Sequence, residues 1–155
     1  MSPARTDAAS LLPVEPVGWA RPRGYSNGML APAGGRLLFV AGQIGWDSQQ
    51  RLVEGGFAEQ FRQALSNVVT VVETAGGHSS DLGRLTIYVS DRSEYLDELG
   101  SVGEAYLEIM GRHFPAMALV VVRSLLEPGA KVEIEGTAVI AEASERIGEG
   151  KSDGD

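Results

Sequence analysis

The chain has 155 residues, of which 43% are hydrophobic and 22% are charged, as is typical of one soluble globular domain. Its 21 acidic residues exceed its 13 basic residues, and the net charge of -8 disfavours a nucleic-acid partner because phosphate backbones attract basic surfaces. The absence of cysteine excludes thiolate nucleophiles, disulfides and cysteine-bound metal centres. No segment has the length of a membrane span or the core of a signal peptide, so we expect a cytoplasmic protein that does not contact membranes.

The composition divides the chain into three regions. Residues 1–17 are rich in Ala, Ser and Pro without periodicity, and they predict a flexible N-terminal arm. Residues 18–141 carry the periodic apolar patterns of one folded domain. Residues 142–155 contain five acidic and two basic residues with almost nothing to bury, and they predict an acidic disordered tail.

The first half of the domain predicts a hairpin followed by a helix. Two apolar segments, 29–31 and 37–44, flank a Gly-rich stretch and predict two strands that pair as a β-hairpin. From Phe57 to Ala75 the apolar residues recur every three or four positions, which predicts an amphipathic helix. Gly76 and the glycine after it are typical of a helix C-terminus.

The second half predicts a strand, a helix and two more strands. The strand covers 82–89, and helical spacing runs from 96 to 110. The segments 115–123 and 132–140 are β-branched or alternating, and we expect them to pair with each other. The fold class is therefore α+β, with one mixed sheet and two helices on one face. Because the segment from 116 to 122 is apolar on both faces, we expect a second copy of the chain to cover it.

The chemistry available to this sequence is narrow. His78 and His113 lack the spacing of metal ligands, and no glycine motif for phosphate or dinucleotide binding occurs, so we predict neither a metal nor a cofactor. Glu133 and Glu135 point to the same face of a predicted strand. Either this face is open to water, or it lines a polar pocket where a carboxylate holds or deprotonates a water molecule.

An ordered set of short motifs resembles the RidA/YjgF family, the reactive-intermediate imine deaminases. The resemblance extends from about Gly24 to Ile140, and it implies a chorismate-mutase-like fold, a homotrimer and small-molecule clefts between subunits. The motifs are Tyr25-Ser26, Val40-Ala-Gly-Gln-Ile44, Gln63-Ala-Leu-Ser-Asn-Val68, Val72-Glu-x-Ala-Gly76, Tyr88-Val-x-Asp91, Tyr106, Phe114-Pro-Ala116 and Pro128-Gly-Ala-Lys-Val-Glu-Ile-Glu135.

The resemblance also implies which residues form the site. Glu133 takes the place of the glutamate that holds the water attacking the imine or enamine, and Tyr25, Gly42 and Gln43 match positions that line the cleft. Met117 stands where active members carry an arginine that grips the substrate carboxylate. The sequence departs from the family at three more positions of the cleft, Ala41, Gly103 and Leu119.

These departures change the expected substrate. A thioether has no donor to replace the two charge-assisted hydrogen bonds of a guanidinium, so an amino-acid-derived 2-imino acid should be a poor substrate. Met117 and Leu119 present an apolar wall instead, which favours hydrophobic or aromatic ligands. Arg123, which shares the strand parity of Met117, or Arg23, just before Tyr25, could supply the missing charge from another direction.

Two functions follow from this sequence. The first is a metal-free hydrolase that deaminates imines or enamines with altered specificity. The second is a non-catalytic trimer that binds an apolar metabolite or a partner protein in the same cleft. The endoribonuclease activity attributed to some family members is disfavoured by the acidic balance and by the lack of a basic patch.

Overall fold

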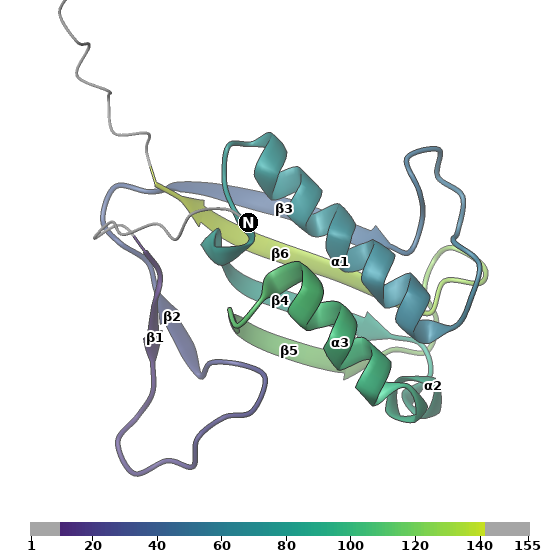
Figure 1. The fold of residues 1–155 in the computed structure, drawn as a ribbon, viewed down its shortest axis with the longest axis horizontal. Coiled ribbons are helices and arrows are strands. Elements are labelled where there is room, and N and C mark those ends of the chain that lie inside the picture. The colour runs from purple at the N-terminus through teal and green to yellow at the C-terminus, as the bar shows by residue number, and fades with distance from the viewer. Residues whose placement is uncertain (1–9, 142–155) are drawn as a thin grey trace, which may run out of the picture.

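The domain is built on a four-stranded mixed sheet with strand order β3-β6-β4-β5 (Figure 1). The computed structural model describes residues 10–141, and the predicted acidic tail lies outside them. Strands β4 and β5 are parallel, whereas β6 is antiparallel to both β3 and β4. The elements are β1 (Leu12–Val14), β2 (Gly28–Leu30), β3 (Arg36–Ile44), α1 (Phe57–Thr74), the 3-10 helix η1 (Ser79–Asp81), β4 (Leu82–Val89), α2 (Arg92–Asp97), α3 (Leu99–Met110), β5 (Ala116–Val121) and β6 (Val132–Ile140).

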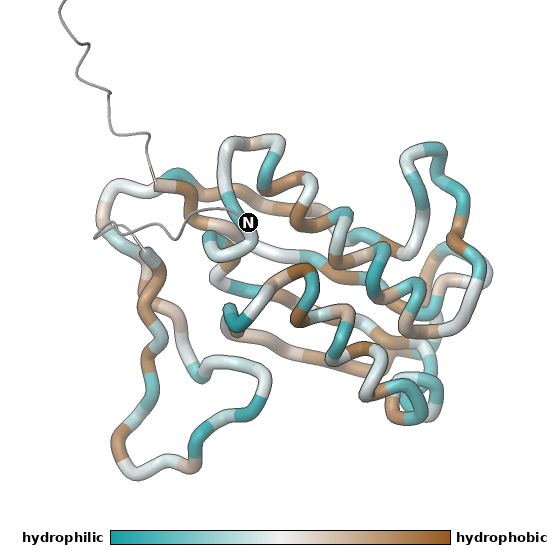
Figure 2. The backbone as a smooth tube through the Cα atoms, viewed as in Figure 1, coloured by the Kyte–Doolittle hydropathy of each residue, from teal (hydrophilic) through white to brown (hydrophobic). Residues whose placement is uncertain are grey.

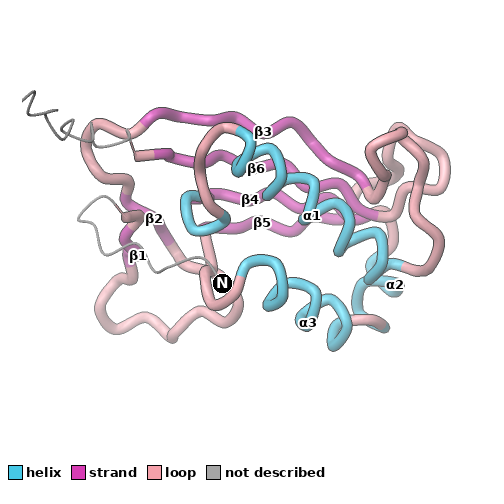
Figure 3. The backbone as a smooth tube through the Cα atoms, turned by 45° about the horizontal axis from the view of Figure 1, so that its top comes forward, coloured by secondary structure: helices cyan, strands magenta, loops and turns pink. Residues whose placement is uncertain are grey.

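Helices α1 and α3 lie on one face of the sheet, as predicted (Figure 3). Along β6 every second residue from Val132 to Ile140 is buried against these helices, and the residues between them are half-buried on the opposite face. We call this opposite face the open face, because no described helix covers it. Leu37 and Phe39 of β3 point to it and are 62% and 75% exposed. An apolar surface of this kind is typical of an interface.

Helix α1 confirms the prediction from apolar spacing. Its buried side chains recur every three or four residues and form the helix side of the core against the sheet. It ends one residue before Ala75, and Gly76 then adopts a φ of 91°. Only glycine takes up such a left-handed conformation without strain, which is why the helix stops there.

The predicted second helix is divided into α2 and α3. The Asp91 side chain accepts hydrogen bonds from the backbone N–H groups of Ser93 and Glu94 and so starts α2 earlier than predicted. Glu98 separates the two helices, and its carboxylate accepts a hydrogen bond from the backbone N–H of Phe57 at 3.0 Å. The break therefore places a negative charge at the N-terminus of α1.

Both predicted strand pairings are wrong. Strand β2 pairs with β1, within the segment predicted as an arm, while β3 pairs with β6, so the opening hairpin does not form. Strands β5 and β6 are separated by β4, which pairs with both. Strands β5 and β6 do run in opposite directions, as in a hairpin. No local pattern reveals that a third strand lies between them. Figure 2 shows the β1–β2 ribbon, with its own apolar residues, beside the main sheet.

No helix within residues 10–141 is long and apolar enough to cross a membrane.

Polar contacts hold the end of β3 against α1. The Asn67 side-chain amide donates to the backbone carbonyls of Ile44 at 3.2 Å and Trp46 at 2.9 Å. The buried Gln60 side chain donates to the carbonyl of Gly129 and accepts from the N–H of Lys131, which ties α1 to the start of β6.

Gly45→Ala is expected to lower the free energy of unfolding by about 1 to 3 kcal/mol, because the added methyl group overpacks the contact between β3 and α1. A Cβ at Gly45 would lie 2.7 Å from the Gln60 Cα, and the backbone there cannot yield as a flexible side chain would. Urea unfolding followed by circular dichroism measures the change. Gly83→Ala is the control, since its nearest neighbour would be a Leu11 methyl carbon at 3.5 Å. Equal stability of the two variants would contradict the argument.

Candidate functional site

A cleft of about 570 Å³ opens between α3, β5 and the segment that precedes β2. Its volume lies within the range of small-molecule sites, and its walls are mainly apolar. The lining residues are Arg23, Gly24, Tyr25, Phe61, Ile87, Tyr95, Leu99, Val102, Gly103, Tyr106, Leu107, Phe114, Met117 and Leu119. Five of the residues predicted for the site therefore lie together here: Arg23, Tyr25, Gly103, Met117 and Leu119.

Tyr25 reaches the cleft because Ser26 anchors its segment to the start of β5. The Ser26 side chain is buried, and its hydroxyl donates a 2.6 Å hydrogen bond to the backbone carbonyl of Phe114. The Ser26 backbone N–H donates to the carbonyl of Pro115 at 3.1 Å. The segment thus forms a wall of the cleft although it is far from β5 in sequence.

Met117 and Leu119 form the floor of the cleft. They pair in register with Leu85 and Ile87, whose side chains are buried under the helices, so both point to the helix side of the sheet. Met117 is half-buried and packs against the core, and Leu119 is 37% exposed. These two side chains bring no hydrogen-bond donor to the floor.

The Tyr106 and Phe114 rings stack with their centroids 5.5 Å apart at the end of the cleft nearest the start of β5. The Tyr106 hydroxyl donates to the backbone carbonyl of His113 at 2.6 Å, and burial raises the pKa of this tyrosine. Tyr106 therefore stays neutral and offers the cleft an aromatic surface. The motif containing Tyr106 was part of the family resemblance, but its contribution to the cleft was not predicted, because the spacing indicated only a helix core.

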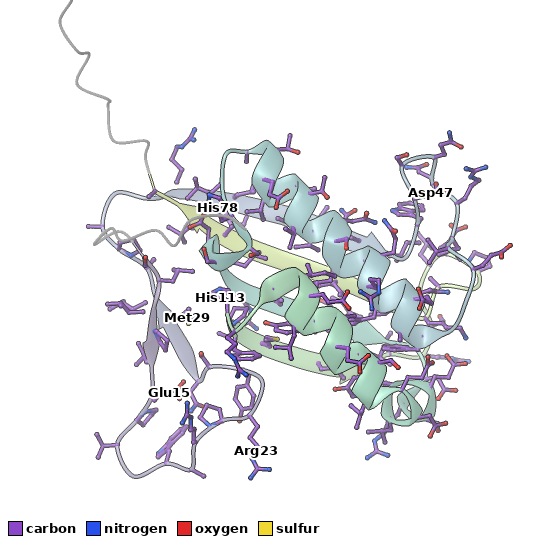
Figure 4. All side chains as sticks on the ribbon, viewed as in Figure 1. Glu15, Arg23, Met29, Asp47, His78 and His113 are labelled. Atoms are coloured by element: carbon purple, nitrogen blue, oxygen red, sulfur yellow. The ribbon has the colours of Figure 1, made fainter. Side chains whose placement is uncertain are left out.

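Two arginines were predicted as sources of a compensating charge, and they lie in different places. Arg23 lines the cleft, and Figure 4 shows it on the loop between β1 and β2 with its side chain pointing away from the sheet. Arg123 follows the C-terminal end of β5, is exposed, and does not line the cleft. Of the two, only Arg23 belongs to the rim of the cleft.

The other predicted site residues gather on the open face around Glu133. Glu133 lies in register with Ile44 of β3 and Tyr88 of β4. A β-bulge between Val40 and Gln43 presses Gly42 against it, and a Cβ at Gly42 would lie 2.9 Å from the Glu133 Cδ. A larger residue at this position would push the Glu133 carboxyl group aside, whereas glycine lets it lie against the bulge.

Ala41 and Gln43 flank this glycine in the bulge. The Gln43 side-chain amide donates to the backbone carbonyl of Ala41 at 3.0 Å, and Ala41 itself is exposed. This hydrogen bond turns the Gln43 side chain back along its own strand.

The two carboxylates of β6 differ in their partners. The Tyr88 hydroxyl donates to Glu135 at 2.7 Å, and this hydrogen bond, followed by desolvation, raises the Tyr88 pKa. The side chain of Glu133 makes no hydrogen bond to any other residue in the range 10–141. Its half-buried carboxylate is therefore free to accept a hydrogen bond from water. Tyr88 was missed as a site neighbour, although its strand parity with Arg84 and Thr86 marks the polar face of β4.

Within one chain the cleft and Glu133 are apart. They lie on opposite faces of the sheet, because Met117 is in register with Leu85 whereas Glu133 is in register with Tyr88. These positions differ by two strands, or about 10 Å, and by three residues along the strands, or about 10 Å. A molecule in the cleft of a single chain would not reach the Glu133 carboxylate of the same chain.

The histidines have local partners. The backbone N–H of His78 donates to the Asp81 carboxylate at 2.8 Å, and the His113 Nε2 lies 2.6 Å from the carbonyl oxygen of Leu82. In the described part of the chain, no three His, Asp or Glu side chains are grouped closely enough to hold a metal ion.

Ser26→Ala is expected to lower the free energy of unfolding by about 1 kcal/mol, because the Phe114 carbonyl loses its donor. It should also speed hydrogen exchange of the segment around Tyr25, since one of its two anchors is gone. Ser90→Ala is the control, because the Ser90 hydroxyl makes only long contacts of 3.4 and 3.5 Å. Mass-spectrometric hydrogen exchange and urea unfolding measure both effects. Unchanged exchange around Tyr25 would contradict the anchoring role.

The sequence matches the family model described as endoribonuclease L-PSP over residues 20–140. It is 33% identical over 116 residues to the human 2-iminobutanoate/2-iminopropanoate deaminase, and the match covers 74% of this chain and 79% of the human protein. It is 34% identical to a RutC family protein of Pyrococcus horikoshii, with 74% of this chain and 85% of the relative covered.

Solved structures show the same fold. A conserved Rid family protein of Yersinia pestis superposes with a TM-score of 0.75 at 28% identity, covering 84% of this chain and 99% of its own. The YjgF gene product of E. coli superposes with a TM-score of 0.58 at 32% identity, covering 74% and 87%. The family model covers most of the chain, and the fold agrees with that of the solved family members. The chain therefore belongs to the RidA/YjgF family.

Proposed function

We propose that this protein is a deaminase that hydrolyses the C=N bond of a small imine, or of an enamine after its protonation to an iminium ion. The observation that carries the proposal is the free, half-buried carboxylate of Glu133 beside the glycine of the β3 bulge. Relatives named as 2-iminobutanoate/2-iminopropanoate deaminases support the same chemistry.

Glu133 acts as the general base in this reaction. Its carboxylate accepts a proton from a bound water as the water oxygen forms a bond to the imine carbon. The protonated side chain then gives this proton to the nitrogen, which yields a carbinolamine. In the second step the carboxylate accepts the proton of the new hydroxyl group and passes it to the nitrogen. The carbonyl forms as the C–N bond breaks with its electrons going to nitrogen, and ammonia leaves. Water is the only co-reactant, and the carboxylate regains its starting state.

The working site in this proposal is formed between copies of the chain. The cleft and Glu133 lie on opposite faces of one sheet, so a substrate can touch both only if the open face of one copy meets the cleft of another. The 75% exposure of Phe39 on the open face agrees with such an interface. The assembly we propose is the homotrimer, whose closed symmetry repeats one heterologous contact three times.

Mixed oligomers test this arrangement. Glu133→Gln removes the base, and Leu119→Trp fills the cleft, so each variant alone should release ammonia poorly. When the two are unfolded and refolded together in equal amounts, about a quarter of the sites should combine an intact base with an intact cleft and regain turnover. The control mixes the two folded proteins without unfolding. A mixture that stays as inactive as its components would contradict the composite site.

The proposed specificity follows from the cleft floor. Met117 and Leu119 supply no charge, and Arg23 lies only at the rim, so the enzyme would not depend on an α-carboxylate for binding. Ammonia release from freshly generated imines and enamines, with and without that group, tests the function. Accelerated release from members of this panel is the expected result, and release no faster than in buffer would overturn the proposal.

A second candidate function is a non-catalytic trimer that captures an apolar metabolite or a partner protein in the cleft. It is favoured by the residues that depart from the family, Ala41, Gly103, Met117 and Leu119, none of which carries an acid, a base or a hydrogen-bonding side chain. Tight binding of an apolar ligand without any ammonia release across the panel would favour this function over the first.

A further inference from the structure

Helix α3 presents a gap to the cleft at Gly103. We infer that this gap and the aromatic end of the cleft together hold a ring-sized apolar group, such as a phenyl group, carried by the imine or enamine substrate. The nature of the reacting group rests on the proposed function, whereas the ring-sized pocket rests on the geometry of the cleft itself. Gly103 is then a specificity-determining residue.

The cleft has the shape and surface for a ring. The stacked Tyr106 and Phe114 lie at one end, with Met117 and Leu119 below. Aromatic rings bind such surfaces by offset or edge contacts, and a thioether also packs well on a ring. A cleft of about 570 Å³ is much larger than a substrate whose side chain is a methyl or ethyl group would fill.

The polar groups of the cleft are confined to a few positions. Among the lining residues only Arg23, Tyr25, Tyr95 and Tyr106 can form hydrogen bonds through their side chains. The Tyr106 hydroxyl is already used by the His113 carbonyl. Tyr25 is 43% exposed, and Arg23 is exposed at the rim. The polar, reacting end of a ligand therefore belongs near the mouth, and its apolar group belongs inside.

Helix α3 contains a matched pair of glycines, which makes the role of Gly103 testable. A Cβ at Gly100 or at Gly103 would meet no atom within 4 Å, so neither substitution is blocked by packing. Both glycines are exposed, and leucine is a better helix former at either position. Only Gly103 lines the cleft. Gly103→Leu and Gly100→Leu thus differ in whether the new side chain enters the cleft.

Binding is measured first, with two unreactive amides that differ in one group, 3-phenylpropanamide and propanamide. Calorimetry or ligand-observed NMR on the full-length protein should show the phenyl compound binding about tenfold tighter or more, as expected for burial of a ring. Gly103→Leu should abolish that preference, and Gly100→Leu should keep it. Circular dichroism and size-exclusion chromatography verify that both variants fold and assemble as the parent does.

Turnover is measured second, with 2-imino-3-phenylpropanoate and 2-iminopropanoate, each generated from its amino acid. The expected result is a kcat/KM preference for the phenyl substrate that Gly103→Leu removes. Phenyl-selective binding without ammonia release from either substrate or from any member of the imine and enamine panel would support the ring pocket and overturn the proposed deaminase function. Equal binding of the two amides by the parent protein would overturn the ring pocket. So would a preference that both leucine variants lose, or one that neither loses.

Discussion

Glu133→Gln is expected to lower kcat for ammonia release by about 10²- to 10⁴-fold, which is the usual contribution of a general base. The amide keeps the size of the side chain but cannot accept the proton of the attacking water. Because the Glu133 side chain makes no hydrogen bond within residues 10–141, its replacement should leave the fold and the assembly unchanged. Steady-state kinetics on the best substrate of the panel, with circular dichroism and size-exclusion chromatography alongside, measures the effect.

Glu135→Gln is the matched control for this experiment. It changes the same residue type on the same face of β6, two residues away, and its side-chain oxygen can still accept the hydrogen bond of Tyr88. We expect kcat within about threefold of the parent, because Glu135 is already engaged and faces no bulge. A folded Glu133→Gln protein that turns over like the parent would remove the mechanism. Equal losses in both variants would mean that only the charge of this face matters.

Met117→Arg is expected to raise the affinity for substrates that carry an α-carboxylate by about 30-fold to several thousand-fold, which corresponds to about 2 to 5 kcal/mol for a buried charge pair. The guanidinium would offer two donors to the carboxylate on the floor of the cleft, where the thioether offers none. The half-buried stem of the new side chain would replace the contacts of the methionine. The measurement is kcat/KM for 2-iminopropanoate.

The control for this substitution is Met117→Leu, which preserves apolar volume and should leave the discrimination between substrates unchanged. The thermal midpoint of each variant must also be compared, since Met117 packs against the core. A stable Met117→Arg protein with unchanged kcat/KM for 2-iminopropanoate would show that the substrate carboxylate does not bind at the floor of the cleft. A neutral apolar substrate should bind less tightly to the same variant, because it would strip water from the guanidinium group without replacing the lost hydrogen bonds.

Local sequence patterns predicted most of the elements of this fold. The spacing of apolar residues located α1, and the alternation along 132–140 located β6 together with the shared face of Glu133 and Glu135. These features depend on residues within a few positions of one another, and side-chain periods of 3.6 and 2 report them directly. Strand pairing depends on residues that are far apart in the chain, so these periods do not report it. For this reason the sequence did not show that β4 lies between β5 and β6.

The candidate site shows the same division. The motifs pointed to Tyr25, Gly42, Gln43 and Glu133. The presence of methionine at position 117 was enough to predict an apolar wall. They did not reveal that Tyr25 is fastened to β5 through Ser26, because that contact joins segments 88 residues apart. Tyr88 beside the carboxylates and the stack of Tyr106 on Phe114 were equally hidden.

The sequence by itself determined most of the secondary structure, the acidic charge balance, the absence of cysteine chemistry and the residue types available for a site. Only the tertiary structure decided that Met117 and Glu133 face opposite sides of one sheet and that the cleft lies under Gly103. The physical reason is range. Periodicity and turn chemistry are local, whereas strand order, register and the shape of a cleft result from packing among residues distant in the chain, which no short pattern encodes.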